Sequence, residues 1–282
     1  MKLGFCTMGY VPYTELDEAI HRIANMGYEV IDFWAYSPHL DPRHYDKEGR
    51  KHIRQLVEKV GLEIAGLSVQ GGGLGMQFNF SHSNPKVRKD TVEYYLDCVD
   101  LAADVGSPVV NLISGHMVYG TTLEQAWAWN RECIQQVVER AEKKNIVIAI
   151  HTLTPPESEV IVTLDDALRM MKEVGSEKLK VMIDTADQNV TEPNLTDAVR
   201  KVGKDLVYVH LNDNCGEGRG DIHLPPGRGN INWKKFVKTL KEIGYNGNMT
   251  VQVNTGYPID IDAWAEESLE YMRKVLQEVG WS

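Results

Sequence analysis

Short apolar stretches alternate with longer amphipathic stretches along the whole chain. The apolar stretches are rich in β-branched residues, as buried strands are, and they begin at intervals of roughly 27 to 45 residues. Eight strands are predicted in this way, at Lys2–Cys6, Val30–Trp34, Glu63–Ser68, Val109–Ile113, Val147–His151, Lys180–Asp184, Val207–Leu211 and Thr250–Val253.

Between these strands, apolar residues return every three or four positions, which predicts helices with one buried face. Glycine follows several of these segments, for example Gly27 and Gly106. Glycine is the residue expected where a helix ends. The predicted helices are Thr14–Asn25, His52–Val60, Lys86–Val105, Leu123–Lys143, Leu164–Val174, Asn194–Val202, Trp233–Ile243 and Ile261–Val279.

A strand followed by a helix, repeated eight times, predicts an α/β fold of the parallel (β/α)8 TIM-barrel type. A doubly wound sheet is the alternative, but it more often needs fewer strands. Its dinucleotide-binding motif is also missing, because the glycines from Gly71 to Gly75 lead into a polar stretch and not into a helix. We interpret them as a flexible loop over the barrel mouth. Without a linker or a shift in composition, residues 1–282 are expected to form a single TIM-barrel domain.

The composition narrows the function classes. With 30 Lys and Arg against 40 Asp and Glu, the formal net charge is −10, which argues against a nucleic-acid partner. No apolar run approaches the roughly 18 to 20 residues of a membrane span, and the N-terminus lacks a signal-peptide pattern. The four cysteines lie far apart without metal-site or disulfide spacing. These features predict a cytoplasmic enzyme or binding protein with reduced thiols.

Polar side chains close four of the predicted strands. They are His151, Asp184, His210 and Gln252, and each directly follows apolar residues. In a TIM barrel, chemistry takes place at the C-terminal ends of the strands, so four such side chains can converge on one point. Two imidazoles, one carboxylate and one amide suit a divalent transition metal. We expect Mn²⁺ first, with Co²⁺, Fe²⁺, Zn²⁺ or Mg²⁺ as alternatives.

Two segments carry a resemblance to a known family. The residues from His210 to Asn214 (HLNDN) and from His223 to Trp233 (HLPPGRGNINW) resemble the strand-7 region of the xylose-isomerase-like TIM barrels. This superfamily includes ketose 3-epimerases, hydroxypyruvate isomerase, inosose dehydratase and relatives of endonuclease IV. The resemblance extends nearly end to end, since Gly27–Trp34 (GYEVIDFW) is similar to the family's second strand and Asp184-Thr185 to its sixth.

The resemblance implies one divalent metal ion held by Glu, Asp, His and Glu at four strand ends. In the sugar epimerases of the family, the two glutamates exchange a proton on the substrate through an enediolate. The corresponding residues here are His151, Asp184, His210 and Gln252, so both glutamates are replaced. Where the family often has a histidine three residues after the aspartate, this chain has Asp187.

These replacements change the expected electrostatics. With one carboxylate in place of three, the formal charge of the metal-loaded site moves from about −1 to about +1, or to about 0 if Asp187 lies close by. We expect weaker metal binding, a shift toward nitrogen-preferring ions and better tolerance of a bound anion. Gln252 cannot accept a proton, so His151 is the expected general acid or base, with Asp187 as a further catalytic candidate.

Other residues are candidates for substrate contacts. Trp34 and Asp32 end the second strand and can line a sugar-sized pocket, and His116 follows the fourth. Asp221 and His223 resemble an Asp-x-His pair that the endonuclease relatives use for further metals, although they can equally order the loop before Pro225. The remaining candidates near this loop are Asp213, Arg219 and Arg228, the arginines being suited to an anionic group.

Three functions remain open at this point. The first is a metal-dependent isomerase or epimerase acting on a keto sugar or related polyol. The second is a metal-dependent lyase in which His151 removes a proton and a β-substituent leaves, as in dehydration or in cleavage of an oxidised glycoside. The third is a non-catalytic barrel that binds a carbohydrate or a partner subunit; an Fe(II) oxygenase is given little weight. The resemblance also implies a homodimer or higher homo-oligomer.

Overall fold

The eight predicted strands close into a parallel barrel in the order of the sequence. The computed structural model describes residues 1–69, 77–155, 157–216, 222–254 and 260–281. Each strand pairs in parallel with the next, and the last pairs with the first. The predicted (β/α)8 fold is therefore confirmed, and the strand ends differ from the prediction by one or two residues. The strands are β1 Leu3–Cys6, β2 Val30–Trp34, β3 Glu63–Ser68, β4 Val109–Leu112, β5 Val147–Ile150, β6 Leu179–Asp184, β7 Leu206–Leu211 and β8 Met249–Val251.

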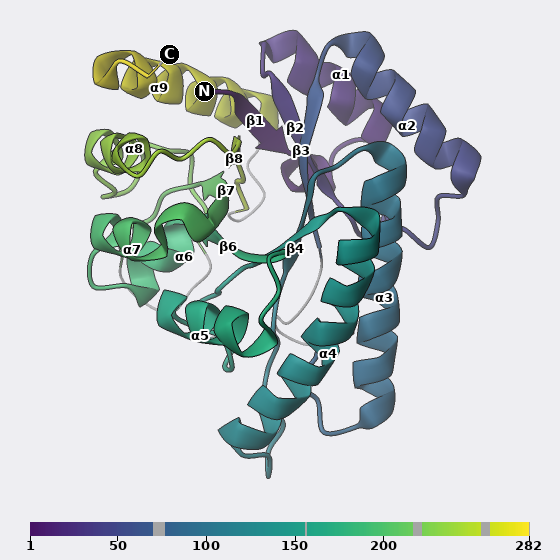
Figure 1. Ribbon diagram of the computed structural model, residues 1–282. Helices are drawn as coiled ribbons and strands as arrows, with labels where there is room; N and C mark the ends of the chain where they lie inside the picture. The colour runs from purple at the N-terminus through teal and green to yellow at the C-terminus, as the bar shows by residue number, and fades with distance from the viewer. Residues whose placement is uncertain (70–76, 156, 217–221, 255–259, 282) are drawn as a thin grey trace.

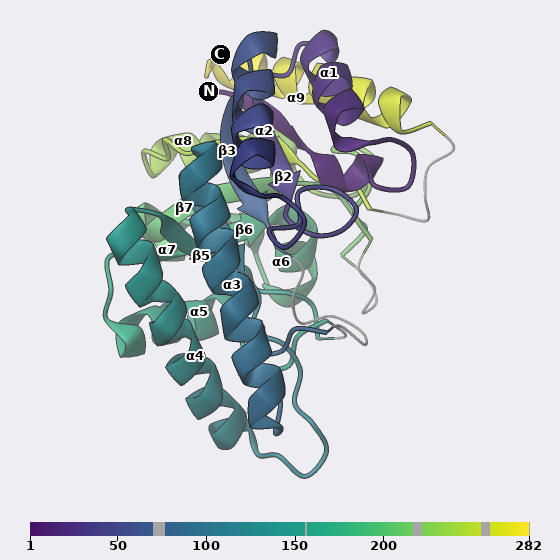
Figure 2. The same cartoon turned by 90° about the vertical axis from the view of Figure 1, so that its right-hand side faces the viewer.

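Helices surround the barrel, and the two termini lie near each other at one end of it (Figure 1). The long helices α3 and α4 run side by side on one flank in both views (Figure 2). The helices are α1 Leu16–Met26, α2 Lys47–Val60, α3 Pro85–Val105, α4 Leu123–Lys144, α5 Leu164–Val174, α6 Thr185–Thr191, α7 Leu195–Val202, α8 Trp233–Glu242 and α9 Ile261–Val279, with short 3₁₀ helices at Thr7–Tyr10 and Gly203–Asp205.

The helix predictions are confirmed except at two places. Helix α2 begins at Lys47 and not at His52, because the Asp46 side chain accepts a hydrogen bond from the Gly49 amide and caps the helix. Helix α6 was not predicted. Its sequence (TADQNVT) has no apolar periodicity, and it forms because the side chain of Asp184 caps its first turn.

The interior of the barrel, below the C-terminal ends of the strands, is filled by a small cluster of buried side chains. Tyr208 is the largest of them, and its hydroxyl lies 2.9 Å from Thr250 Oγ1. The cluster consists of Val30, Ala65, Val109, Ala149, Met182 and Tyr208. A separate and larger apolar core lies between the strands and the helices. The barrel is thus packed below its mouth, as is usual for this fold.

Two further observations bear on the earlier predictions. None of the helices in the described part of the chain is both long and apolar enough to cross a membrane. All four cysteines are free, and three of them are buried.

Candidate metal centre and active site

The alternation of side chains along a strand places the polar residues in one layer directly above the packed interior. Side chains two positions apart point to the same face of a strand, so the residue two positions after an interior residue also faces the barrel axis. This relation links the following pairs from β2, β4, β5, β6, β7 and β8: Val30 and Asp32, Val109 and Asn111, Ala149 and His151, Met182 and Asp184, Tyr208 and His210, Thr250 and Gln252.

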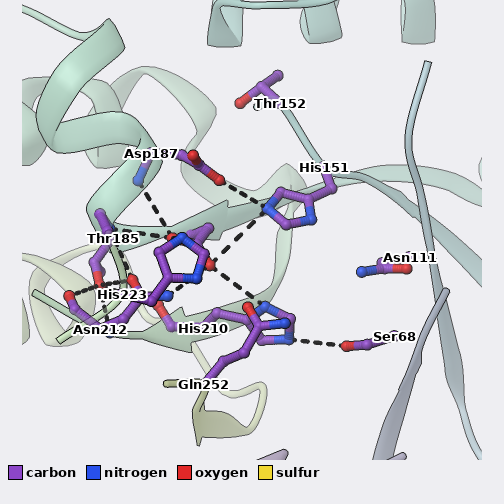
Figure 3. A network of polar contacts seen from close by, with 12 residues as sticks. Ser68, Asn111, His151, Thr152, Thr185, Asp187, His210, Asn212, His223 and Gln252 are labelled. Carbon is purple, nitrogen blue, oxygen red and sulfur yellow. Dashed lines mark hydrogen bonds and ion pairs between the residues drawn. The ribbon is translucent and has the colours of Figure 1, made fainter. Parts of the chain in front are cut away.

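Asp184 lies at the centre of this layer and is surrounded by three imidazoles. Its Oδ2 atom is 3.6 Å from His210 Nδ1 and 4.0 Å from His151 Nε2, and its Oδ1 atom is 3.6 Å from His223 Nε2. Figure 3 shows the three rings turned toward a common point. Asp184 is completely buried. Burial alone would raise the pKa of its carboxyl group, but the imidazoles of His223, His210 and His151 hold that pKa well below its usual range.

The orientation of the Asp184 carboxylate is fixed from both sides. Oδ1 accepts hydrogen bonds from the backbone amides of Ala186 (3.1 Å) and Asp187 (3.3 Å) at the start of α6. Oδ2 accepts a hydrogen bond from Asn212 Nδ2 at 2.8 Å. Asp184 therefore caps α6 and also lies at the centre of the candidate site, so the start of the helix fixes the position of its carboxylate oxygens.

His210 is oriented by a carboxylate on the opposite side of its ring. Its Nε2–H donates to Asp32 Oδ2 at 3.0 Å, and the Ser68 hydroxyl donates to the same oxygen at 2.6 Å. Nδ1 is thereby left to face Asp184. Burial would lower the pKa of His210, but its hydrogen bonds with Asp184 and Asp32 overcome this effect and raise the pKa to about 9. A carboxylate behind a histidine is the arrangement that orients metal-ligating histidines.

His151 forms a buried pair with Asp187. The two atoms His151 Nε2 and Asp187 Oδ2 are 3.2 Å apart, and both side chains are almost completely buried. Asp187 therefore lies close to the candidate ligands, which was the condition for the lower of the two expected formal charges of the metal-loaded site. The nitrogen that faces Asp187 is also the one that lies 4.0 Å from Asp184.

Gln252 completes the layer next to His210 (Figure 3). Its Nε2 lies 3.6 Å from the sulfur atom of Met8, while its Oε1 is buried and has no hydrogen-bond partner among the described residues. A buried amide oxygen without a donor costs free energy unless a ligand satisfies it. Together with His151, Asp184 and His210, whose ligating atoms all lie within 4.8 Å of one another, this oxygen fits a divalent transition metal.

His223 reaches the centre on a loop that folds back over the barrel mouth. It was a candidate for substrate contact, and the structure places it against Asp184. Its backbone pairs with Asn254 after β8, and the neighbouring Leu224 pairs with Asp213 after β7. Asp184, Asp187 and His223 form a second group whose ligating atoms lie within 4.8 Å of one another.

Four of the other candidates have partners that favour structural roles. The Asp213 carboxylate accepts hydrogen bonds from Trp233 Nε1 and the Gly227 amide, both at 2.8 Å, and so shapes the loop after β7. Arg228 pairs with Glu267 of α9 at 2.5 Å. The other two candidates are His116 and Asp32. His116 Nδ1 lies 3.7 Å from Glu159 Oε2, and Asp32 orients the ring of His210.

Trp34 lies half-buried at the end of β2, where its backbone amide donates to Thr7 Oγ1. Arg219, Asp221 and the glycines from Gly71 to Gly75 lie outside the described residues.

The sequence reasoning missed three residues of the centre. Ser68, Asn111 and Asn212 are buried beside the candidate ligands (Figure 3). Ser68 closes β3, so the rule that singled out polar strand ends would have found it if it had been applied to every strand. Asn111 lies inside β4, two positions after the interior residue Val109, and follows from alternation along the strand. Asn212 comes two residues after His210 and follows from the same alternation.

Comparison with known proteins places this geometry in context. The sequence matches the family described as xylose isomerase-like TIM barrel over residues 20–275. Fructoselysine 3-epimerase of Shigella flexneri is 25% identical over 278 residues, which cover 99% of each chain. D-psicose 3-epimerase of Enterocloster bolteae is 30% identical over 249 residues, which cover 83% of this chain and 75% of that one.

Solved structures share the fold. The D-psicose 3-epimerase from Clostridium cellulolyticum H10, determined with D-tagatose, superposes with a TM-score of 0.81 at 22% sequence identity. The superposition covers 98% of this chain and 99% of that chain.

Proposed function

The chain belongs to the xylose isomerase-like TIM barrel family, and from this premise we propose that it is a metal-dependent epimerase or isomerase of a keto sugar. The observation that carries the proposal is the convergence of His151, Asp184 and His210, at the ends of β5, β6 and β7, on one buried point, with Gln252 after β8 lying beside His210 (Figure 3). The similar proteins named fructoselysine 3-epimerase and D-psicose 3-epimerase support a sugar substrate with a carbonyl next to the epimerised carbon.

Asp184, His210, Gln252 and His151 are the residues proposed to hold the metal. Mn²⁺ is the first candidate, and the two imidazoles also suit Co²⁺, Fe²⁺ or Zn²⁺, with Mg²⁺ as a further alternative. When bound, such an ion polarises carbonyl and hydroxyl oxygens and so acidifies the proton on the carbon between them. Asp32 and Ser68 keep His210 in the orientation that the ligand role requires.

His151 is the residue proposed to transfer the proton, with Asp187 orienting its ring. An imidazole can accept and return a proton near neutral pH, whereas the Gln252 amide cannot. Gln252 is therefore proposed to bind the metal or a substrate hydroxyl. Trp34, half-buried at the end of β2, is proposed to pack against the sugar ring.

Solvent-deuterium exchange tests the proposal. The metal-free protein is loaded with Mn²⁺ and incubated in D₂O with ketohexoses, fructoselysine and 3-oxo sugars, and the products are followed by NMR. We expect one deuterium to enter next to the carbonyl, with inversion at that carbon. Sugar binding without any exchange would overturn the proposal and support the non-catalytic alternative.

One variant, His151→Ala, separates the possible roles of His151. If His151 only transfers the proton, His151→Ala loses exchange and keeps its metal affinity; if it is also a ligand, both are lost. His52→Ala is the matched control, because His52 is an exposed histidine that pairs with Asp17 on the outside of the barrel. Unchanged exchange in His151→Ala would remove His151 from the mechanism.

A lyase is the second candidate, and the His151–Asp187 pair favours it. Epimerisation by two bases needs a proton acceptor on each face of the carbon. At the two positions where the resemblance implies glutamates, this chain has one imidazole, that of His151, and the amide of Gln252. One base is sufficient for proton removal followed by loss of a β-substituent. An unsaturated or cleaved product in the same NMR experiment would identify this reaction.

The location and assembly of the enzyme are also proposals. The free cysteines support a cytoplasmic enzyme, and the acidic charge disfavours a nucleic-acid partner. We propose a homodimer or higher homo-oligomer on the family resemblance. Size-exclusion chromatography with light scattering would measure this directly.

A further inference from the structure

We infer that Asn111 is a substrate-binding residue, whose side-chain amide donates a hydrogen bond to a sugar oxygen that the metal does not hold. Asn111 lies in β4, whereas the residues proposed for the metal belong to β6 and β7 or directly follow β5 and β8. The inference rests on the proposed function for the class of ligand, a keto sugar or related polyol. Its test measures binding and not turnover, so the two can fail separately.

The strands place Asn111 in the same layer as the candidate metal ligands. It follows the interior residue Val109 by two positions and therefore faces the barrel axis. In the sheet it pairs with Ala149 of β5, and His151 follows Ala149 by the same two positions. Figure 3 shows the amide nitrogen of Asn111 turned toward the rings of His151 and His210. A sugar bound to a metal at these rings therefore has one side toward this amide.

A backbone hydrogen bond fixes which end of the Asn111 amide faces the centre. Its Oδ1 accepts a hydrogen bond from the Val69 amide at 2.7 Å. A backbone N–H can only donate, so the oxygen lies on this side and Nδ2 on the other. Both residues are almost completely buried, and turning the amide over would leave the Val69 N–H without its acceptor, at a cost in free energy. Asn111 therefore presents a donor to the barrel mouth.

This donor is not used by the described part of the protein. Asn111 Nδ2 has no hydrogen-bond partner among the described residues, although the residue is only 2% exposed. Asn212, in the same layer, differs in that its Nδ2 donates to Asp184 and its Oδ1 accepts from the Ala186 amide, both at 2.8 Å. A buried donor without an acceptor costs free energy unless a ligand or a water molecule supplies one. The one-sided bonding of Asn111 therefore points to a ligand at Nδ2.

The chemistry of Nδ2 defines what it can bind. A neutral N–H donor matches a hydroxyl, carbonyl or oxyanion oxygen, and every carbon of a sugar that carries oxygen offers such an acceptor. A site that hydrogen-bonds a substrate hydroxyl discriminates strongly against the analogue without it, because the buried polar group is then left unpaired. Asn111 is therefore expected to select a sugar that carries an oxygen at the carbon facing β4.

Binding of deoxy sugars tests the inference. Asn111→Asp keeps the volume and an oxygen for the Val69 N–H, but replaces the donor at Nδ2. Isothermal titration measures the dissociation constants of the Mn²⁺-saturated protein for the ketohexose D-psicose and its monodeoxy analogues. We expect Asn111→Asp to bind D-psicose about tenfold or more weakly. The analogue that lacks the oxygen held by Nδ2 should show a similar loss with the unaltered protein and no further loss with Asn111→Asp.

Asn79→Asp is the matched control. Asn79 is a buried asparagine whose amide is bonded within the protein at both ends, Oδ1 to the Ser81 amide at 2.8 Å and Nδ2 to the His116 carbonyl at 2.9 Å. The same chemical change at this position should leave the affinity for D-psicose unchanged.

Each outcome decides the question. Unchanged affinity in Asn111→Asp, or an equal loss for D-psicose and all of its analogues, would overturn the binding role, as would failure of the unaltered protein to bind D-psicose or fructoselysine. If Asn111→Asp fails to fold in circular dichroism, Asn111→Ala removes the donor and is read against the same analogues. Deuterium exchange with unchanged affinity in the variant would leave the proposed function standing without Asn111. The expected pattern of binding without exchange would leave the binding role standing without the reaction.

Discussion

Asp32→Asn isolates the effect of the carboxylate behind His210. Asparagine has nearly the same volume, and its side-chain oxygen can still accept the Nε2–H hydrogen bond that Asp32 Oδ2 accepts at 3.0 Å. The Ser68 hydroxyl can still donate to the same position. The substitution therefore removes a negative charge from a fully buried position while leaving the packing intact.

The expected magnitude depends on pH. Loss of an outer partner of a metal-ligating histidine typically weakens metal binding about 10- to 100-fold, or about 1.4 to 2.8 kcal/mol. Asp32 also helps to raise the pKa of His210 to about 9, so at pH 7 a proton competes with the metal by about 100-fold in the unaltered protein. Asp32→Asn relieves part of this competition. We expect the 10- to 100-fold loss at pH 9 and a smaller loss at pH 7.

Competition between the protein and a chromophoric chelator for Co²⁺ measures the affinity at both pH values. Asp17→Asn is the matched control, because Asp17 also pairs with a histidine, His52, at 2.7 Å, but on the exposed surface. Thermal denaturation without metal checks that both variants fold. Equal affinities at pH 9, or a larger loss at pH 7 than at pH 9, would refute the orienting role assigned to Asp32.

Three further predictions follow from the same contacts. Gln252→Glu adds a carboxylate where, within the described part of the chain, a buried amide oxygen has no hydrogen-bond partner. It should tighten Mn²⁺ binding about tenfold or more by isothermal titration, and no gain would exclude Gln252 as a ligand. Asp213→Ala leaves the Trp233 indole and three backbone amides without their acceptor, and should lower the free energy of unfolding in urea by about 3 kcal/mol or more. A loss below about 1 kcal/mol would contradict this. His210 has a pKa raised from 6.5 to about 9, so its contribution to stability is full below pH 6.5 and is lost as the pH rises through 9. The metal-free protein should therefore melt at a lower temperature at pH 9.5 than at pH 6.5, and His210→Asn should show a smaller difference.

The barrel and the positions of the candidate ligands could be predicted from the sequence because both follow from short-range periodicity. Each strand is an apolar run, and alternation along it decides which side chain faces the axis. His151, Asp184 and His210 end or follow such runs, so their convergence needed no knowledge of the loops.

The partners of these ligands could not be predicted in the same way. Asp32 and His210 are 178 residues apart in sequence and meet across the barrel. His223 reaches Asp184 because its loop pairs with the segments after β7 and β8, a long-range contact that no local pattern encodes. Helix α6 depends on a cap supplied by Asp184 and not on apolar spacing.

The centre contains several carboxylates, although His151 and Gln252 stand where the family resemblance implies glutamates. Asp32 and Asp187 lie 3.0 Å and 3.2 Å from the Nε2 atoms of His210 and His151, so with Asp184 three carboxylates are present. With one dication the formal charge is then about −1, and not the +1 or 0 expected from the ligands alone. The centre differs from the Glu/Asp/His/Glu set in where the negative charge lies, because Asp32 and Asp187 are hydrogen-bonded to the imidazole rings of His210 and His151. A carboxylate bonded to an imidazole orients the ring and fixes its protonated nitrogen. In the proposed mechanism the task of moving a proton therefore falls to His151 and not to a carboxylate, which favours a reaction that needs one base.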